Sequence, residues 1–167
     1  ILGFTVLGNY ALTLQFVAIM MILSTISFKY LLPKDASGEK NAKLKKILIL
    51  VSILIALSGF FFSPYFIENF FTKFSESIIP IQIVSFAVIP TTISVILFSK
   101  ILALEKSRFL IVANSVQLCV ILIATIFLGI LYGIIGVTIA FVLGNTIHAI
   151  TLAVINYNYV GKGKFDI

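Results

Sequence analysis

Five long apolar stretches dominate the sequence, and clusters of charged residues, glycine and proline separate them. The hydrocarbon core of a bilayer is about 30 Å thick, and an α-helix needs about 20 mostly apolar residues to cross it. Each stretch is long enough, so the sequence predicts an all-α integral membrane protein, a five-span helical bundle. The predicted spans are residues 9–32, 44–62, 79–102, 109–131 and 134–157.

The composition excludes a soluble globular domain. Apolar residues make up 60% of the 167 positions and charged residues 11%, whereas soluble domains contain about 45–50% apolar and about 25% charged residues. The mean hydropathy is +1.19. A single cysteine, Cys119, excludes a disulfide scaffold. We expect one transmembrane unit over residues 1–167, and because the chain begins with Ile1 we expect a fragment of a longer chain.

The net charge of +6 follows the connections between the spans. Eleven of the twelve basic residues fall at 29–46, 100–108 and 162–164, which would share one side of the membrane, and only Lys73 falls on the other. Because cytoplasmic connections collect Lys and Arg, we predict a cytoplasmic basic loop at 33–46, an external N-terminal end and a cytoplasmic C-terminal end in a plasma or inner cell membrane. Charge distributed in this way favours membrane lipid over nucleic acid as a partner.

The segment between the second and third spans is amphipathic. We predict that the second span stops at Pro64 and that residues 64–78 lie on the outer membrane surface. Aromatic and aliphatic residues recur there at helical spacing beside polar ones. The apolar residues are Phe66, Ile67, Phe70, Phe71 and Phe74, and the polar ones are Glu68, Asn69, Lys73 and Glu76.

Pro90 lies in the middle of the third predicted span. Proline removes a backbone donor, so it deprives the carbonyl of Phe86 of its partner and predicts a kink. The hydroxyls of Thr91, Thr92 and Ser94 follow directly and are placed to satisfy freed carbonyls. The kink is interpreted either as static shape or as a hinge.

The fifth predicted span carries small residues at every fourth position, Gly136, Ala140 and Gly144. Such a stripe lets a neighbouring helix approach closely, so it predicts a helix-packing face. His148, the only histidine, follows one turn later. It is interpreted either as an interhelical or headgroup-level residue, or as a protonatable or substrate-contacting group in a cavity.

Amide side chains also occur inside the apolar spans, where they need hydrogen-bond partners. They either join helices or line the water-filled path of a transporter. With His148, they are the candidate cavity-lining residues: Gln15, Gln82, Asn114, Gln117 and Asn145.

The sequence contains little that favours catalysis. None of its six acidic residues falls inside a predicted span, so paired carboxylates or a metal cluster at membrane depth are not expected. The sequence also lacks a Walker A loop and a CxxC pair. We therefore predict a transporter rather than an enzyme, without catalytic residues, metal or cofactor.

Several short motifs occur in an order that resembles the carboxy-terminal half of polysaccharide flippases, the O-antigen and oligosaccharide-lipid exporters of the MATE-like superfamily. The most specific is the turn Tyr-Gly-x-x-Gly-x-x-x-Ala at 132–140. One departure is that residues 69–74 lack a glycine that the family often has there. The other matching pieces are 1–4, 6–12, Leu32, Pro33, Ser37, Pro64, Pro90 and 103–107.

This resemblance implies most of one lobe of a two-lobed transporter, whose central cavity opens alternately inward and outward to export a lipid-linked oligosaccharide. The missing N-terminal lobe would be the partner of this chain. Family members bind the anionic lipid headgroup with basic cavity residues, and the predicted spans contain no deep Lys or Arg, so that part of the site would lie in the other lobe. Two alternatives stay open: a membrane scaffold or assembly subunit, and a small-molecule or drug exporter of the same superfamily.

Overall fold

The computed structural model describes residues 4–39 and 41–160, and its elements are all helical. Four segments are long and apolar enough to cross a membrane, Gly8–Ala36, Ala42–Phe70, Thr72–Ala103 and Ser107–Tyr159. The chain is therefore an all-α bundle of the membrane-spanning kind. In order, its elements are α1 (Phe4–Ala36), α2 (Ala42–Phe70), η1 (Thr72–Ser77), α3 (Ile78–Ser85), α4 (Val88–Ala103), α5 (Ser107–Ile155) and η2 (Asn156–Val160).

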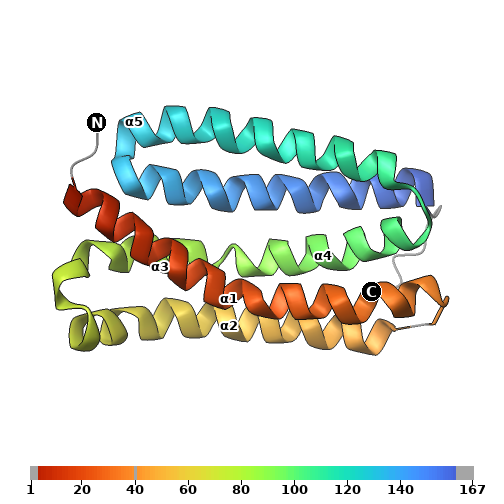
Figure 1. Ribbon diagram of the computed structural model, residues 1–167, viewed down its shortest axis with the longest axis horizontal. Helices are drawn as coiled ribbons and strands as arrows, with labels where there is room; N and C mark the ends of the chain where they lie inside the picture. The colour runs from red at the N-terminus through yellow and green to blue at the C-terminus, as the bar shows by residue number, and fades with distance from the viewer. Residues whose placement is uncertain (1–3, 40, 161–167) are drawn as a thin grey trace.

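The longest segment, α5, folds back on itself at Gly133. This residue has φ 58° and ψ −132°, a conformation that glycine adopts without the steric cost of a Cβ. Two arms, residues 107–132 and 134–155, therefore lie side by side (Figure 1). The reversal falls between the predicted spans 109–131 and 134–157.

α4 occupies the centre of the bundle. α1 packs along one side of it and α5 along another, and α2 packs against α3 and α4 (Figure 1). One apolar cluster joins α4 to both arms of α5, through buried residues that include Ile101, Leu110 and Leu152. A second joins α1, α2 and α3 through Leu12, Ile67 and Ile81.

α2 continues through Pro64 to Phe70, beyond the predicted end of the second span. Pro64 cannot donate to the carbonyl of Phe60 one turn earlier. Gln82 from α3 supplies the missing donor, with its Nε2 3.1 Å from the Phe60 oxygen. Only Thr72–Ser77 of the predicted surface segment 64–78 forms a separate element, the short 3₁₀-helix η1.

The third predicted span is interrupted between Ser85 and Val88, just before Pro90. Pro90 lies in the first turn of α4, where a missing backbone donor costs little. The carbonyl of Phe86 accepts from the backbone N–H of Ile89 at 3.3 Å, so it needs no side-chain donor. The hydroxyls of Thr91 and Thr92 donate to the carbonyls of Ala87 and Val88. The helix is therefore interrupted at residues 86–87, one turn before Pro90, and a hinge there stays a prediction.

The predicted basic loop 33–46 is much shorter in the structure. α1 continues through Pro33 to Ala36 and α2 begins at Ala42, so only residues 37–41 connect them. The reason is a buried ion pair: Lys45 Nζ lies 2.9 Å from Asp35 Oδ1, and Ser99 of α4 donates to Asp35 Oδ2 at 2.8 Å. Because the two charges neutralise each other, both residues can be packed among the helices.

The basic stretches of the described chain gather at one end of the bundle. The end of α1, the start of α2, the end of α4 and the start of α5 all lie there, whereas the reversal at Gly133 and η1, with Lys73, lie at the other end (Figure 1). The basic residues that cluster in the sequence are thus also close together in the folded chain.

Candidate functional site: a polar cleft over α4

A cleft of about 330 Å³ runs over α4 between α1 and α5. It forms because α1 and α5 both pack on α4 without an extended contact between them. α4 provides the floor, Phe28 of α1 one wall, and the two arms of α5 the other. The lining residues are Phe28, Thr91, Ser94, Val95, Phe98, Gln117, Asn145 and His148.

Asn145 is the centre of the hydrogen bonds in this cleft. Its Oδ1 accepts from Gln117 Nε2 at 3.3 Å and shares the single hydroxyl proton of Thr91, at 3.2 Å, with the carbonyl of Ala87. Its Nδ2 donates to the carbonyl of Phe141 at 2.8 Å. One side chain therefore ties α4 and both arms of α5 together.

Two other polar atoms of the cleft are buried without a partner. Ser94 Oγ and His148 Nε2 have no hydrogen bond within the described part of the chain, and their residues are only 4% and 8% exposed. A buried polar group without a partner costs about 1–3 kcal/mol. Both residues line the cleft, so their unpartnered atoms become available to a molecule in it once the side chains turn toward it.

The wall opposite α5 is aromatic. Phe28 and Phe98 meet edge to face with their ring centroids 5.8 Å apart. A hydrogen-bond contact of 3.3 Å between the hydroxyls of Ser24 and Thr92 holds α1 to α4 close by. The cleft therefore combines a fixed apolar wall with a polar one.

The cleft lies near the middle of the apolar segments. Gln117 comes ten residues after the start of α5 at Ser107, which at 1.5 Å per residue is about 15 Å along the helix. That is about half of a 30 Å hydrocarbon core. The polar atoms of the cleft are thus far from both ends of the bundle.

The structure places the sequence-predicted residues in three environments. Gln117, Asn145 and His148 line the cleft. Gln82 joins α3 to α2, and Gln15 and Asn114 are exposed on the outside of the described bundle. Gln117 and Asn145 join the two arms of α5 and also line the cleft. That the cleft belongs to the water-filled path of a transporter stays a prediction.

The small residues of the second arm of α5 lie close to the first arm. A Cβ on Gly136 would come 1.9 Å from the carbonyl oxygen of Leu128, and one on Gly144 2.2 Å from Cγ1 of Ile121. Ala140, between them, is fully buried. The partner of this face is therefore the other arm of the same helix.

Sequence reasoning missed the floor and the aromatic wall of the cleft. Thr91, Ser94, Val95 and Phe98 share one face of α4 because they are spaced i, i+3, i+4 and i+7. This helical spacing is visible in the sequence, so the shared face could have been predicted. The opposite wall, Phe28, could not be assigned without knowing which helix packs beside α4.

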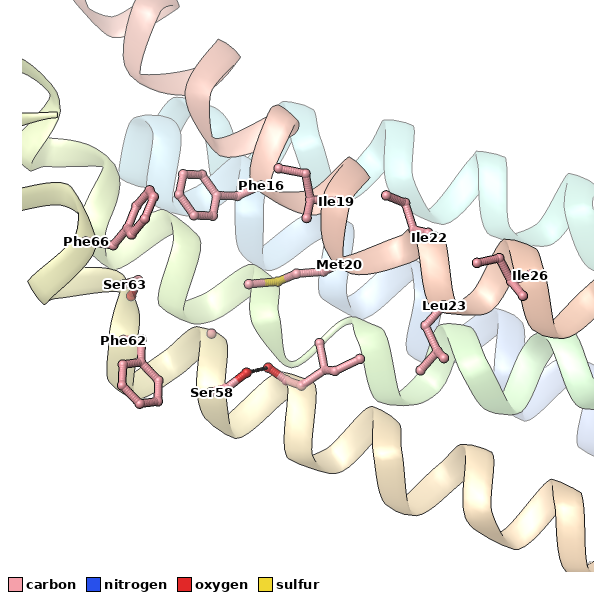
Figure 2. Close-up of a pocket in the computed structure, with 12 residues that line it drawn as sticks. Phe16, Ile19, Met20, Ile22, Leu23, Ile26, Ser58, Phe62, Ser63 and Phe66 are labelled. Atoms are coloured by element: carbon pink, nitrogen blue, oxygen red, sulfur yellow. Dashed lines mark hydrogen bonds between the residues drawn. The ribbon is translucent and has the colours of Figure 1, made fainter. Parts of the chain in front are cut away.

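A separate groove of about 580 Å³ lies between α1 and α2, and Figure 2 shows its lining. Phe16, Ile19 and Ile22 of α1 and Phe62 and Phe66 of α2 line it, and the rings of Phe16 and Phe66 meet edge to face with their centroids 5.8 Å apart. Its two hydroxyls are already satisfied by their own helix, since Ser58 donates to Ile55 at 2.8 Å and Ser63 to Phe60 at 3.4 Å. The groove is thus an apolar surface.

Polar contacts also fix the end of the bundle opposite the basic end. Asn9 Nδ2 donates to Glu76 Oε2 at 2.9 Å, and Ser77 Oγ donates to Asn9 Oδ1 at 2.9 Å. Both are interhelical contacts between α1 and the η1 region. The Glu76 carboxylate therefore has a structural role, because it accepts a hydrogen bond that holds α1 to the η1 region.

Within residues 4–39 and 41–160 the structure has no cluster of three or more His, Cys, Asp or Glu side chains able to hold a metal ion. Comparison with protein-family models, curated proteins and solved structures finds no match to this chain.

Proposed function

We propose that this chain is part of a flippase that moves a lipid-linked oligosaccharide across a cell membrane by alternating access, and that it corresponds to the carboxy-terminal portion of that transporter. The observation that carries the proposal is the cleft over α4, which holds unpartnered polar atoms at the depth of the hydrocarbon core. Buried polar groups at this depth are costly and mark substrate paths in membrane proteins.

In this proposal the bundle crosses the membrane five times, because each arm of α5 is long enough for one crossing. The basic end faces the cytosol, in keeping with the preference of Lys and Arg for cytoplasmic connections. The reversal at Gly133 then lies on the outer side. The N-terminal end of the chain is outside and the C-terminal end inside.

The groove between α1 and α2 supports a lipid-linked substrate. Its apolar lining offers hydrocarbon-compatible surface, and its serine hydroxyls need no further partner. The lipid tail of such a substrate can therefore lie in the apolar groove while its sugar part lies in the polar cleft. α1 contributes residues to both the groove and the cleft.

The transport step requires no bond to be made or broken. The break between α3 and α4 provides a place where α4 can tilt, directly beside Thr91 at the floor of the cleft. Tilting of α4 would change the width of the cleft and expose it to one side at a time. An anionic headgroup would be bound elsewhere in the transporter, since the described cleft lining contains no Lys or Arg.

The test is complementation with the complete gene that encodes this chain, in cells that lack their own oligosaccharide-lipid flippase. We expect restored export of the glycan, and at least a roughly tenfold loss of export for Asn145→Leu, because this change removes the hydrogen bonds to Thr91 and Gln117. Thr146→Val is the matched control, since its hydroxyl bonds only its own helix, at 2.8 Å from the Val142 oxygen.

Failure of the gene to restore export despite normal membrane insertion would contradict the proposal. Equal export by Asn145→Leu and Thr146→Val would remove the cleft from the transport path.

A further inference from the structure

The cleft over α4 is polar but carries no formal charge in the described structure when His148 is neutral. Its polar lining consists of two hydroxyls, two amides and one imidazole, from Thr91, Ser94, Gln117, Asn145 and His148. A charged ligand at this depth would need an opposite charge to offset its desolvation. An uncharged ligand needs only hydrogen bonds.

The free atoms of the cleft define the type of hydrogen bond that the ligand must make. The hydroxyl of Ser94 can both donate and accept, and the imidazole Nε2 of His148 does one or the other according to its tautomer. The hydroxyl proton of Thr91 is already shared between the Ala87 carbonyl and Asn145, and Gln117 already donates to Asn145. A hydroxyl-bearing ligand satisfies both free atoms, because a hydroxyl group is itself donor and acceptor.

The other wall favours a ligand with apolar faces as well. Phe28 and Phe98 form an edge-to-face pair, and Val95 lies beside them on the floor. A pyranose ring has hydroxyl groups around its rim and C–H groups on its faces, so it can bond the polar wall while its C–H face packs on the aromatic one. The volume of about 330 Å³ is at the lower end of the range for small-ligand sites.

We propose that this cleft is a subsite for an uncharged sugar ring, with sugar hydroxyls bonded to Ser94 Oγ and His148 Nε2 and a C–H face packed against Phe28 and Phe98. The inference rests on the proposed flippase function and refines it. The part of the oligosaccharide that occupies this half of the transporter is a neutral sugar. Uronic acid residues and the pyrophosphate are excluded from the cleft.

The test uses the full-length protein in lipid nanodiscs and measures binding of methyl glycosides by saturation-transfer NMR. The probes are the methyl glycosides of glucose, galactose and N-acetylglucosamine, with methyl glucuronide as the charged comparison. We expect a saturable signal from at least one neutral glycoside, and weaker binding of the glucuronide than of its glucose counterpart.

Two variants assign the signal to the cleft. Ser94→Ala removes one free hydroxyl and should weaken binding about fivefold to tenfold, and Val95→Phe should abolish it by filling the cleft. Ser115→Ala is the matched control, because Ser115 is exposed on the outside of the described first arm of α5. Equal chromatographic behaviour in detergent shows that all three variants are folded.

Lack of a neutral-glycoside signal, tighter binding of the glucuronide, or a signal unchanged in both Ser94→Ala and Val95→Phe would overturn the subsite. The complementation test separates this outcome from the proposed function. Export without glycoside binding contradicts the subsite alone, and glycoside binding without export contradicts the flippase alone.

Discussion

At the scale of single residues, packing partners decide what a polar side chain does. Asn114 and Gln117 lie three residues apart on one helix and were both candidate cavity-lining residues, yet Gln117 lines the cleft and Asn114 is exposed. The second arm of α5 covers only part of the first. The sequence shows which amides need partners, but the position of the neighbouring helix determines which of them receive one.

Glycine is required at position 144 because the two arms of α5 pack closely there. Because the Cβ of Gly144→Ala would lie 2.2 Å from Ile121 Cγ1, we expect overpacking to lower the free energy of unfolding by about 1–3 kcal/mol. Thermal unfolding of the full-length protein in detergent, followed by circular dichroism, measures it.

Gly129→Ala is the control for this prediction. Its Cβ would be 3.4 Å from Val137 Cγ2, an ordinary contact, and alanine is the better helix former by about 1 kcal/mol. We expect its stability to be unchanged or raised. Equal losses in the two variants would contradict close packing of the arms of α5.

At the scale of elements, two prolines that were expected to end helices do not end them. Pro33 and Pro64 both lie inside helices, whereas Pro80 and Pro90 each lie in the first turn of a helix, α3 and α4. For Pro64 the reason is local chemistry, since Gln82 from another helix bonds the carbonyl that proline leaves free. A sequence reveals the proline and the amide separately, but their pairing appears only when α2 and α3 are packed.

The pairing of Pro64 with Gln82 predicts non-additive mutations. Gln82→Leu removes the closer of the two side-chain donors to the carbonyl of Phe60, leaving Ser63 at 3.4 Å, and should cost about 1 kcal/mol of stability. In a Pro64→Ala background it should cost almost nothing from this source, because the substituted alanine donates its own backbone N–H to Phe60. A double-mutant cycle of thermal unfolding measures the coupling, and a coupling energy near zero would show that the hydrogen bond does not support α2.

At the scale of the whole molecule, the sequence predicted the all-helical membrane architecture, because length and hydropathy alone decide it. The extent of the basic loop 33–46 differed, since the pairing of Asp35 with Lys45 is a contact between two helices. The cleft was predicted only in part: three of its residues stood out as polar groups among apolar ones, whereas its floor and aromatic wall required the packing of α1 and α5 on α4.

Membrane orientation is the claim on which the proposed transport path depends, and cysteine accessibility tests it most directly. In a Cys119→Ser background, single cysteines are introduced by Ser37→Cys in the connection between α1 and α2 and by Tyr132→Cys beside the reversal of α5. We expect a membrane-impermeant maleimide to label Tyr132→Cys in intact cells and Ser37→Cys only after the membrane is permeabilised. Labelling of both from the same side, or of Ser37→Cys from outside, would contradict the five-crossing arrangement with its basic end in the cytosol.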